Sequence, residues 1–137
     1  KRKKRVSGLV LIAPAVDMTE KLMWNNFSDN EKSMINKKGY IEIFSDEYPP
    51  YKITKNLIDD GRKYLLMDQQ ISLDCPVSII HGIKDEAVPW SLSIELSKKI
   101  SSNSITQSFI KDGDHGLSRP TDLDHIFFSV EQIIKKI

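Results

Sequence analysis

Three short apolar runs dominate the pattern of hydrophobic and polar positions along the chain. They cover Val6 to Pro14 (VSGLVLIAP), Pro76 to His81 (PVSIIH) and Ile105 to Lys111 (ITQSFIK). The first two are almost continuously apolar, which is typical of strands buried on both faces of a parallel sheet. The third run alternates in part and stops at an Asp-Gly pair, so it is predicted to lie nearer the sheet edge.

Helical spacing of apolar residues follows the second and third runs. After the second run, Pro89 precedes a helix with apolar positions four residues apart at Leu92, Leu96 and Ile100. Near the C-terminus, Thr121 and Asp124 resemble a capping box at the start of a helix. Its apolar stripe comprises Leu123, Ile126, Phe127, Val130, Ile133, Ile134 and Ile137. Strand, helix, strand, helix in this order predicts right-handed parallel crossovers and an α/β fold.

Residues 17–70 are more polar than the flanking segments and lack their apolar runs. Helices are predicted over Thr19–Trp24, over Ser28–Lys38 with Gly39 ending it, and over Thr54–Met67, with a short strand at Ile41–Phe44. An insertion of this length is too long for an ordinary connection and suggests a helical lid or cap. The predicted organisation is a first core strand in residues 1–16, a cap in residues 17–70, and core strands and helices in residues 71–137.

Composition and charge indicate a globular protein and argue against a nucleic-acid-binding one. The chain is 39% hydrophobic and 28% charged, as expected for a globular protein. Residues 1–5 (KRKKR) hold five of the 20 basic residues, which leaves 15 against 19 acidic ones, so the remainder is not a nucleic-acid surface. A solvated segment is favoured for KRKKR over a nucleic-acid or localisation tail.

Neither a membrane span nor an export signal is visible. No apolar run approaches the roughly 20 residues that cross a bilayer, and no signal peptide is evident. The only cysteine, Cys75, excludes an internal disulfide and fits a cytoplasmic location. The first residue is Lys1 rather than Met, so the natural start is expected to lie upstream.

Two candidate catalytic residues follow the second and third strands. Asp85 lies in HGIKDEAVP, just after the second strand, and His115 lies in GDHG, just after the third. Ligands and catalytic groups gather at the carboxyl edge of an open parallel sheet, which places both residues at one edge. A carboxylate beside an imidazole fixes the ring tautomer and stabilises the imidazolium, which is the acid–base half of a nucleophilic site.

Other readings of the same residues carry less weight. Glu86 competes with Asp85 as the acid, but the spacing favours Asp85. Asp112 and Asp114 are predicted to be turn formers. His81 ends a strand and is predicted to be structural. A metal site built from His81, Asp85 and His115 matches no known metal signature, so no metal is predicted.

These motifs resemble those of the α/β-hydrolase superfamily, whose triad follows the chain order Ser, then Asp or Glu, then His. HGxxDxxVP is similar to the family's acid motif, and DHG to its histidine motif. GLVLIAPAVD, Gly8 to Asp17, resembles the strand that follows the nucleophile elbow. The combination is most similar to bacterial serine esterases related to the ABHD-type palmitoyl-protein thioesterases. The resemblance implies that Asp85 is the triad acid and His115 the triad base.

The chain departs from the family pattern because it contains no G-x-S-x-G. The resemblance therefore implies the C-terminal part of an α/β-hydrolase parallel sheet, about three strands, with the serine and oxyanion hole upstream of Lys1. The whole protein is expected to hydrolyse a carboxylic ester or an acyl thioester without a cofactor, and this chain alone is expected to be inactive. Trp24 and Phe27 are candidates for an acyl pocket, or for the internal packing of the cap.

Two alternatives from other classes remain open. In the first alternative, the chain is a non-catalytic fragment that self-associates through its open sheet edge, or that binds its missing N-terminal half. A peptidase of the prolyl-oligopeptidase type shares the same motifs, but the insertion is long for the catalytic domain of that group.

Overall fold

The computed structural model describes residues 5–45 and 49–137, and divides the chain into two compact units. One, here called the core unit, contains Met67–Ile137 together with the segment that precedes Asp17. The other, the insertion unit, is Asp17–Leu66, which starts where the cap was predicted to start and ends four residues earlier. Of the basic run at the N-terminus only Arg5 lies within the described residues, where it is exposed.

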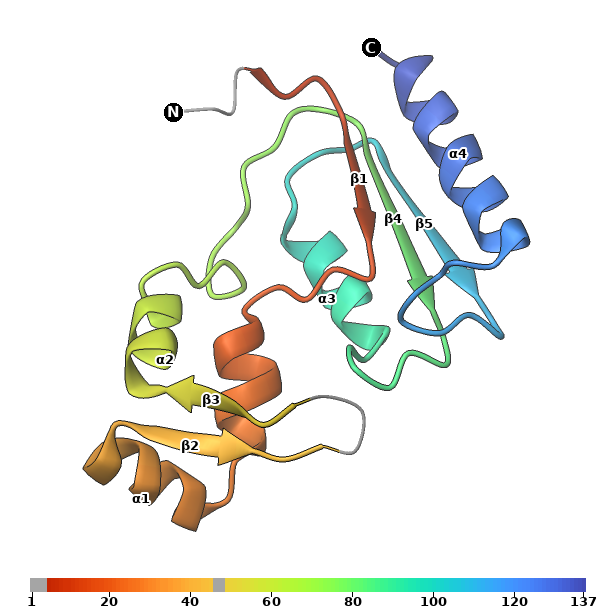
Figure 1. Ribbon diagram of the computed structural model, residues 1–137. Helices are drawn as coiled ribbons and strands as arrows, with labels where there is room; N and C mark the ends of the chain where they lie inside the picture. The colour runs from red at the N-terminus through yellow and green to blue at the C-terminus, as the bar shows by residue number, and fades with distance from the viewer. Residues whose placement is uncertain (1–4, 46–48) are drawn as a thin grey trace. The chain divides into compact units, whose positions relative to one another are not determined.

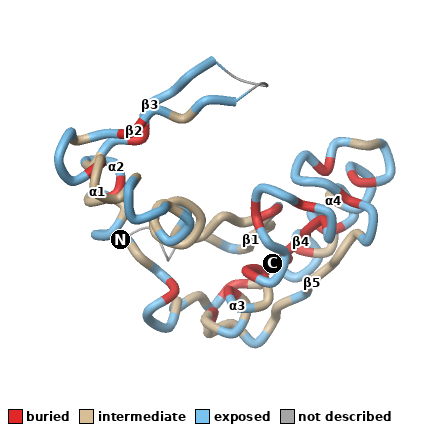
Figure 2. The backbone as a smooth tube through the Cα atoms, turned by 90° about the horizontal axis from the view of Figure 1, so that it is seen from below, coloured by how far each residue is buried: buried red, intermediate tan, exposed pale blue. Residues whose placement is uncertain are grey.

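A three-stranded parallel sheet forms the centre of the core unit, in the order β1-β4-β5 (Figure 1). The strands are β1 (Leu9–Ile12), β4 (Val77–Gly82) and β5 (Ile105–Ile110). Every residue of β4 is buried, as its apolar sequence predicted (Figure 2). The prediction that the first strand is buried on both faces is wrong, because its first three residues are only half-buried and Ile12 is 44% exposed.

Two helices cover opposite faces of this sheet, as Figures 1 and 2 show from different sides. They are α3 (Ser91–Lys99), which buries Leu92 and Leu96, and α4 (Pro120–Ile134). The α/β class with a parallel sheet and flanking helices is therefore confirmed.

The predicted capping box of the last helix is wrong. The helix begins with Pro120, whose fixed φ suits the first helical position, and Arg119 occupies the N-cap. The carboxylate of Asp122 accepts a hydrogen bond from the Arg119 backbone N–H at 3.2 Å. The cap therefore lies two residues earlier than the Thr121–Asp124 pair.

Most of the predicted apolar stripe of α4 is exposed rather than buried. The residues that α4 buries in the core unit are Asp122, Ser129 and Ile133. The residues here called the α4 apolar face are exposed large hydrophobics on or just after the helix: Leu123, Phe127, Phe128, Val130, Ile134 and Ile137. Exposed apolar patches are often sites of interaction with other molecules.

The insertion unit begins with a single turn of π-helix at Thr19–Met23 and a 3-10 turn at Trp24–Asn26. Helix α1 (Asp29–Lys38) follows and confirms its prediction. The Ser28 side chain accepts from the Glu31 N–H, Glu31 bonds back to Ser28, and Gly39 ends the helix with a φ of 83°.

An antiparallel hairpin, β2 (Tyr40–Ile43) with β3 (Tyr51–Thr54), was only half predicted, because the sequence reading missed β3. Helix α2 (Lys55–Arg62) is shorter than the predicted Thr54–Met67. Thr54 instead caps it by accepting from the Leu57 N–H. The unit buries a core of its own, made of Ile35, Ile41, Ile53 and Ile58. Within the described residues, no helix is long and apolar enough to span a membrane.

Candidate active site

Two glycines let the loops after β4 and β5 meet at the carboxyl edge of the sheet. A methyl group on Gly82 would overlap the backbone of Gly113 and would lie 2.6 Å from the Asp114 carbonyl oxygen. The two loops are joined by a hydrogen bond from the Lys84 N–H to the Gly113 carbonyl at 2.9 Å. The close approach of these backbones brings the acid loop and the histidine loop together.

Asp85 and His115 are in direct contact at this edge. The buried Asp85 carboxylate accepts through Oδ1 from the N–H groups of Ala87 and Val88, at 2.9 and 2.8 Å. Its Oδ2 accepts from His115 Nδ1 at 2.9 Å. Glu86, the competing acid, is exposed. The geometry therefore selects Asp85 as the partner of the histidine.

The electrostatics of Asp85 favour its charged form. Burial alone would raise the pKa of this carboxyl, but the Val88 N–H, the His115 ring and the Ala87 N–H bind the ionised oxygens. Together they lower the pKa of Asp85 below its ordinary value. The His115 side chain is 54% exposed and gives Nδ1 to Asp85, which leaves Nε2 as the nitrogen that can take a proton.

The loop that carries His115 is held in a strained conformation by a buried side chain. Leu117 has a φ of 40°, in the left-handed region that L-residues rarely adopt, yet its side chain is 1% exposed. Its N–H donates to Asp114 Oδ1 at 3.0 Å, which confirms Asp114 as a turn former. Burial of Leu117 over Gly113 offsets the backbone strain and fixes the loop beside the dyad.

Arg119, at the start of α4, forms ion pairs with residues on both sides of this loop. The Arg119 guanidinium contacts both oxygens of Asp112, at 2.7 and 3.2 Å, and both oxygens of Asp122, each at 2.8 Å. The prediction of Asp112 as a simple turn former was therefore incomplete. The roles of Leu117 and Arg119 in holding this loop were not predicted, because neither type of residue indicates a fixed loop by itself.

His81 belongs to the same hydrogen-bonded group as the dyad. Its ring is fully buried, with Nδ1 2.6 Å from Ser93 Oγ and Nε2 3.0 Å from the Val88 carbonyl. Nε2 also lies 3.1 Å from Asp85 Oδ2. The prediction of a structural role matches the burial of His81 but missed its contact with the acid.

Comparison with known proteins identifies the architecture that carries this site. No family model matches the chain. The palmitoyl-protein thioesterase ABHD10 of Bos taurus mitochondria is 28% identical over 140 residues, covering 99% of this chain and 45% of that protein. A presumed hydrolase from Agrobacterium vitis S4 has a solved structure with 36% identity and a TM-score of 0.87, over 94% of this chain and 50% of the other. The mouse α/β-hydrolase domain-containing protein 10 superimposes with 26% identity and a TM-score of 0.86, over 98% and 54%. The fold is that of the α/β-hydrolases.

This chain spans about half the length of the α/β-hydrolases that it matches. ABHD10 palmitoyl-protein thioesterases are its homologues, and both the predicted resemblance and the predicted fold are confirmed. The order of the acid and the histidine along the chain is also that of the α/β-hydrolases.

The predicted acyl-pocket residues lie in the insertion unit. Trp24 and Phe27 pack against the buried isoleucine core of the unit, and the Arg62 guanidinium lies 4.5 Å from the centroid of the Trp24 ring. This is the internal packing that the sequence left open as an alternative. A role for either residue in substrate binding stays a prediction.

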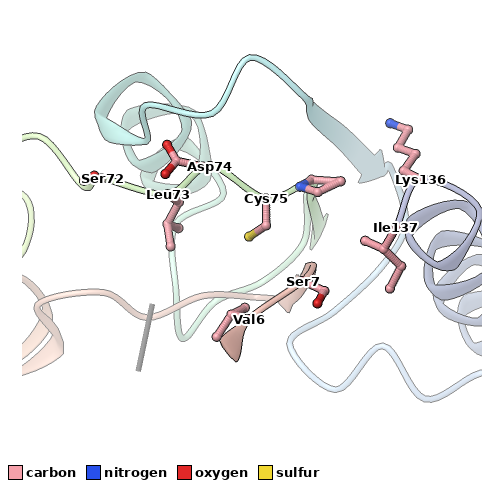
Figure 3. Close-up of a pocket in the computed structure, with 9 residues that line it drawn as sticks. Val6, Ser7, Ser72, Leu73, Asp74, Cys75, Lys136 and Ile137 are labelled. Atoms are coloured by element: carbon pink, nitrogen blue, oxygen red, sulfur yellow. The ribbon is translucent and has the colours of Figure 1, made fainter. Parts of the chain in front are cut away.

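A pocket of about 450 Å³ opens at the other edge of the sheet (Figure 3). It is lined by residues that precede β1 and β4 and by the C-terminus, among them Ser7, Asp74, Cys75 and Lys136. In α/β-hydrolases the chemistry sits at the carboxyl edge, so this pocket does not belong to the dyad. Within residues 5–45 and 49–137 no group of three or more His, Cys, Asp or Glu side chains is placed to hold a metal ion.

Acidification is expected to destabilise the core unit partly through Asp122. Its hydrogen bonds with Arg119 lower the pKa of this carboxyl in the folded state, despite its burial. The stabilisation from Asp122 is therefore fully present at pH values above the pKa of this carboxyl in the unfolded chain, about 4. It is lost as the pH falls through the lower pKa of the folded state. Asp122→Asn should reduce the pH dependence of the urea midpoint between neutral pH and about pH 2. Asp124→Asn, on the exposed side of the helix, is the control, and equal slopes for both variants would contradict the expectation.

Proposed function

We propose that this chain supplies the acid–base half of a serine hydrolase that acts on a carboxylic ester or an acyl thioester. The observation that carries the proposal is the 2.9 Å bond between the buried Asp85 and the half-exposed His115. The names of its relatives support the substrate class, because the homologues are hydrolases and include palmitoyl-protein thioesterases.

The proposed chemistry follows from the orientation of the histidine. A serine hydroxyl presented to His115 Nε2 would lose its proton to the ring as its oxygen attacks the acyl carbon. Asp85 would hold Nδ1–H in place and stabilise the imidazolium that forms. The same ring would then give the proton to the departing alkoxide or thiolate, and water would release the acyl group by the reverse sequence.

The serine and the oxyanion hole are proposed to come from outside this sequence, which has no G-x-S-x-G. The chain by itself is therefore expected not to turn over substrate. The insertion unit, with Trp24 and Phe27, is proposed to act as a cap that sets acyl preference. A cytoplasmic location stays a prediction.

Reconstitution with a complementary polypeptide tests the proposed function. The Agrobacterium vitis protein supplies one, namely the part of its chain that this protein does not cover. We expect the mixture to hydrolyse a 4-nitrophenyl ester or a palmitoyl thioester, while neither component does so alone. Asp85→Asn should lower kcat by about 10⁴, because the wrong histidine tautomer is then favoured.

Glu86→Gln is the matched control on the same loop and should leave the rate unchanged. The proposal is overturned if the active mixture is indifferent to Asp85→Asn and His115→Ala, or if a complex forms and shows no hydrolysis of either substrate.

The α4 apolar face favours a second candidate, a non-catalytic chain that associates with copies of itself. Six large apolar side chains are exposed there, and such a patch binds either the complementary half or another copy. Sedimentation of the chain alone separates the two. A dimer that Phe127→Asp converts to monomer supports self-association, whereas a wild-type monomer contradicts it. The peptidase alternative receives no support from the names of the relatives.

A further inference from the structure

The Asp85 carboxylate is surrounded by four hydrogen-bond partners, two for each oxygen. Oδ1 takes the two backbone N–H groups of Ala87 and Val88, and Oδ2 lies against two histidine rings, at 3.1 Å from His81 Nε2 and 2.9 Å from His115 Nδ1. A carboxylate oxygen has two lone-pair sites, so the positions on Oδ2 are filled. The proposed mechanism uses only one of these two rings.

We propose that His81 is a positioning residue that fixes Oδ2 of Asp85 and, through it, the tautomer and direction of His115. This role rests on the proposed function, because it matters to catalysis only where His115 acts as the base. His81 does not touch the reacting atoms, since its side chain is completely buried beneath the acid.

The tautomer of His81 follows from its neighbours. Nε2 faces two groups that only accept, the Asp85 carboxylate and the Val88 carbonyl, so Nε2 carries the hydrogen. Nδ1 is then the acceptor, and the Ser93 hydroxyl donates to it at 2.6 Å. His81 is thereby assigned as the Nε2–H tautomer, held from both sides by groups that are themselves buried.

The two rings therefore bind one oxygen as opposite tautomers. His81 donates to Oδ2 from Nε2, and His115 donates to it from Nδ1. Because His81 occupies one lone-pair site and the backbone holds Oδ1, His115 is left with a single direction of approach. That direction keeps Nδ1 of His115 facing Oδ2, where the carboxylate requires Nδ1–H and Nε2 stays the basic nitrogen.

Nitrogen-15 NMR of the imidazole rings tests this assignment without requiring activity. The chain has three histidines, so single variants assign every ring. We expect His81 in the Nε2–H form, His115 in the Nδ1–H form, and the exposed His125 as a mixture. His81→Phe removes the donor and keeps a ring in the core, and His115 should then become a tautomer mixture. His81→Gln restores a donor near the Nε2 position and should restore the single Nδ1–H form.

A purely structural His81 predicts a different outcome. The inference is overturned if folded His81→Phe protein keeps His115 in one Nδ1–H tautomer, or if His81→Gln fails to differ from His81→Phe. Should His81→Phe not fold, Ser93→Ala replaces it, because it leaves Nδ1 of His81 without a donor at little change in volume. Ser93→Ala should shift the His115 ring signals in the same direction by a smaller amount, and no shift would overturn the role. His125→Gln is the matched control and should leave the His115 signals unchanged.

In the reconstituted hydrolase, His81→Phe should lower kcat by about 10²-fold with KM nearly unchanged, as misplacement of a base does. The two proposals fail separately. If NMR shows opposite tautomers for His81 and His115 but the reconstituted complex does not hydrolyse substrate, the proposed function is wrong and the assignment of His81 stands. Hydrolysis that is lost with Asp85→Asn but insensitive to His81→Phe would remove the role of His81 alone.

Discussion

Replacing Gly82 by alanine is expected to lower the free energy of unfolding of the core unit by about 3 kcal/mol or more. The added methyl group would overlap backbone atoms of Gly113 and Asp114 rather than the end of a flexible side chain. No rotamer change relieves such a clash, so the loop that carries His115 must move away from the loop that carries Asp85. Urea denaturation measures the stability, and the His115 ring signals report the separation of the dyad.

Gly116→Ala is the matched control for Gly82→Ala. It lies in the same histidine loop, but an added methyl group there would be 3.5 Å or more from its neighbours, an ordinary contact. We expect a change of less than about 1 kcal/mol in its stability. Equal effects of the two variants would show that the close approach of Gly82 and Gly113 does not hold the loops together.

Ile35→Ala is expected to unfold the insertion unit while leaving the core unit folded. The Ile35 side chain is completely buried in the isoleucine core of this unit, and truncating such a residue costs about 2–5 kcal/mol. A unit of this size, Asp17–Leu66, has little stability to lose. Amide hydrogen exchange should show loss of protection throughout the insertion unit and retained protection in β4.

Leu57→Ala provides the comparison for Ile35→Ala, because Leu57 is 42% exposed on α2 of the same unit. It should cost less than about 1 kcal/mol and preserve protection in both units. Simultaneous loss of protection in β4 with Ile35→Ala would contradict the division of the chain into two separately packed units.

The elements that the sequence predicts well are those with local causes. Helix α1 is bounded by Ser28, which caps it through Glu31, and by Gly39, whose positive φ ends it. Strand β4 was recognisable because its sequence is mostly apolar, as expected for a central parallel strand, and every residue of it is buried. The dyad was predictable because each member lies in a short motif directly after a strand.

The features that were not predicted depend on contacts made in the fold or on a competing local motif. Strand β3 exists because Ile53 pairs with Ile41 across the hairpin and both enter the same core, whereas the polar residues around it carry little strand signal. The role of His81 needs the fold to bring Ser93 and Asp85 to its two nitrogens. The start of α4 was misplaced because Thr121 and Asp124 have the spacing of a capping box. The helix in fact starts two residues earlier, with Arg119 at the N-cap and Pro120 at the first helical position.

The acid, both histidines and the two touching glycines all come from one uninterrupted stretch, from β4 to the start of α4. Its contacts close over some thirty residues, so forming them carries a modest entropic cost. We therefore expect residues 77–134, which include the whole of α4, to keep the contact between Asp85 and His115 when they are grafted together onto a related hydrolase.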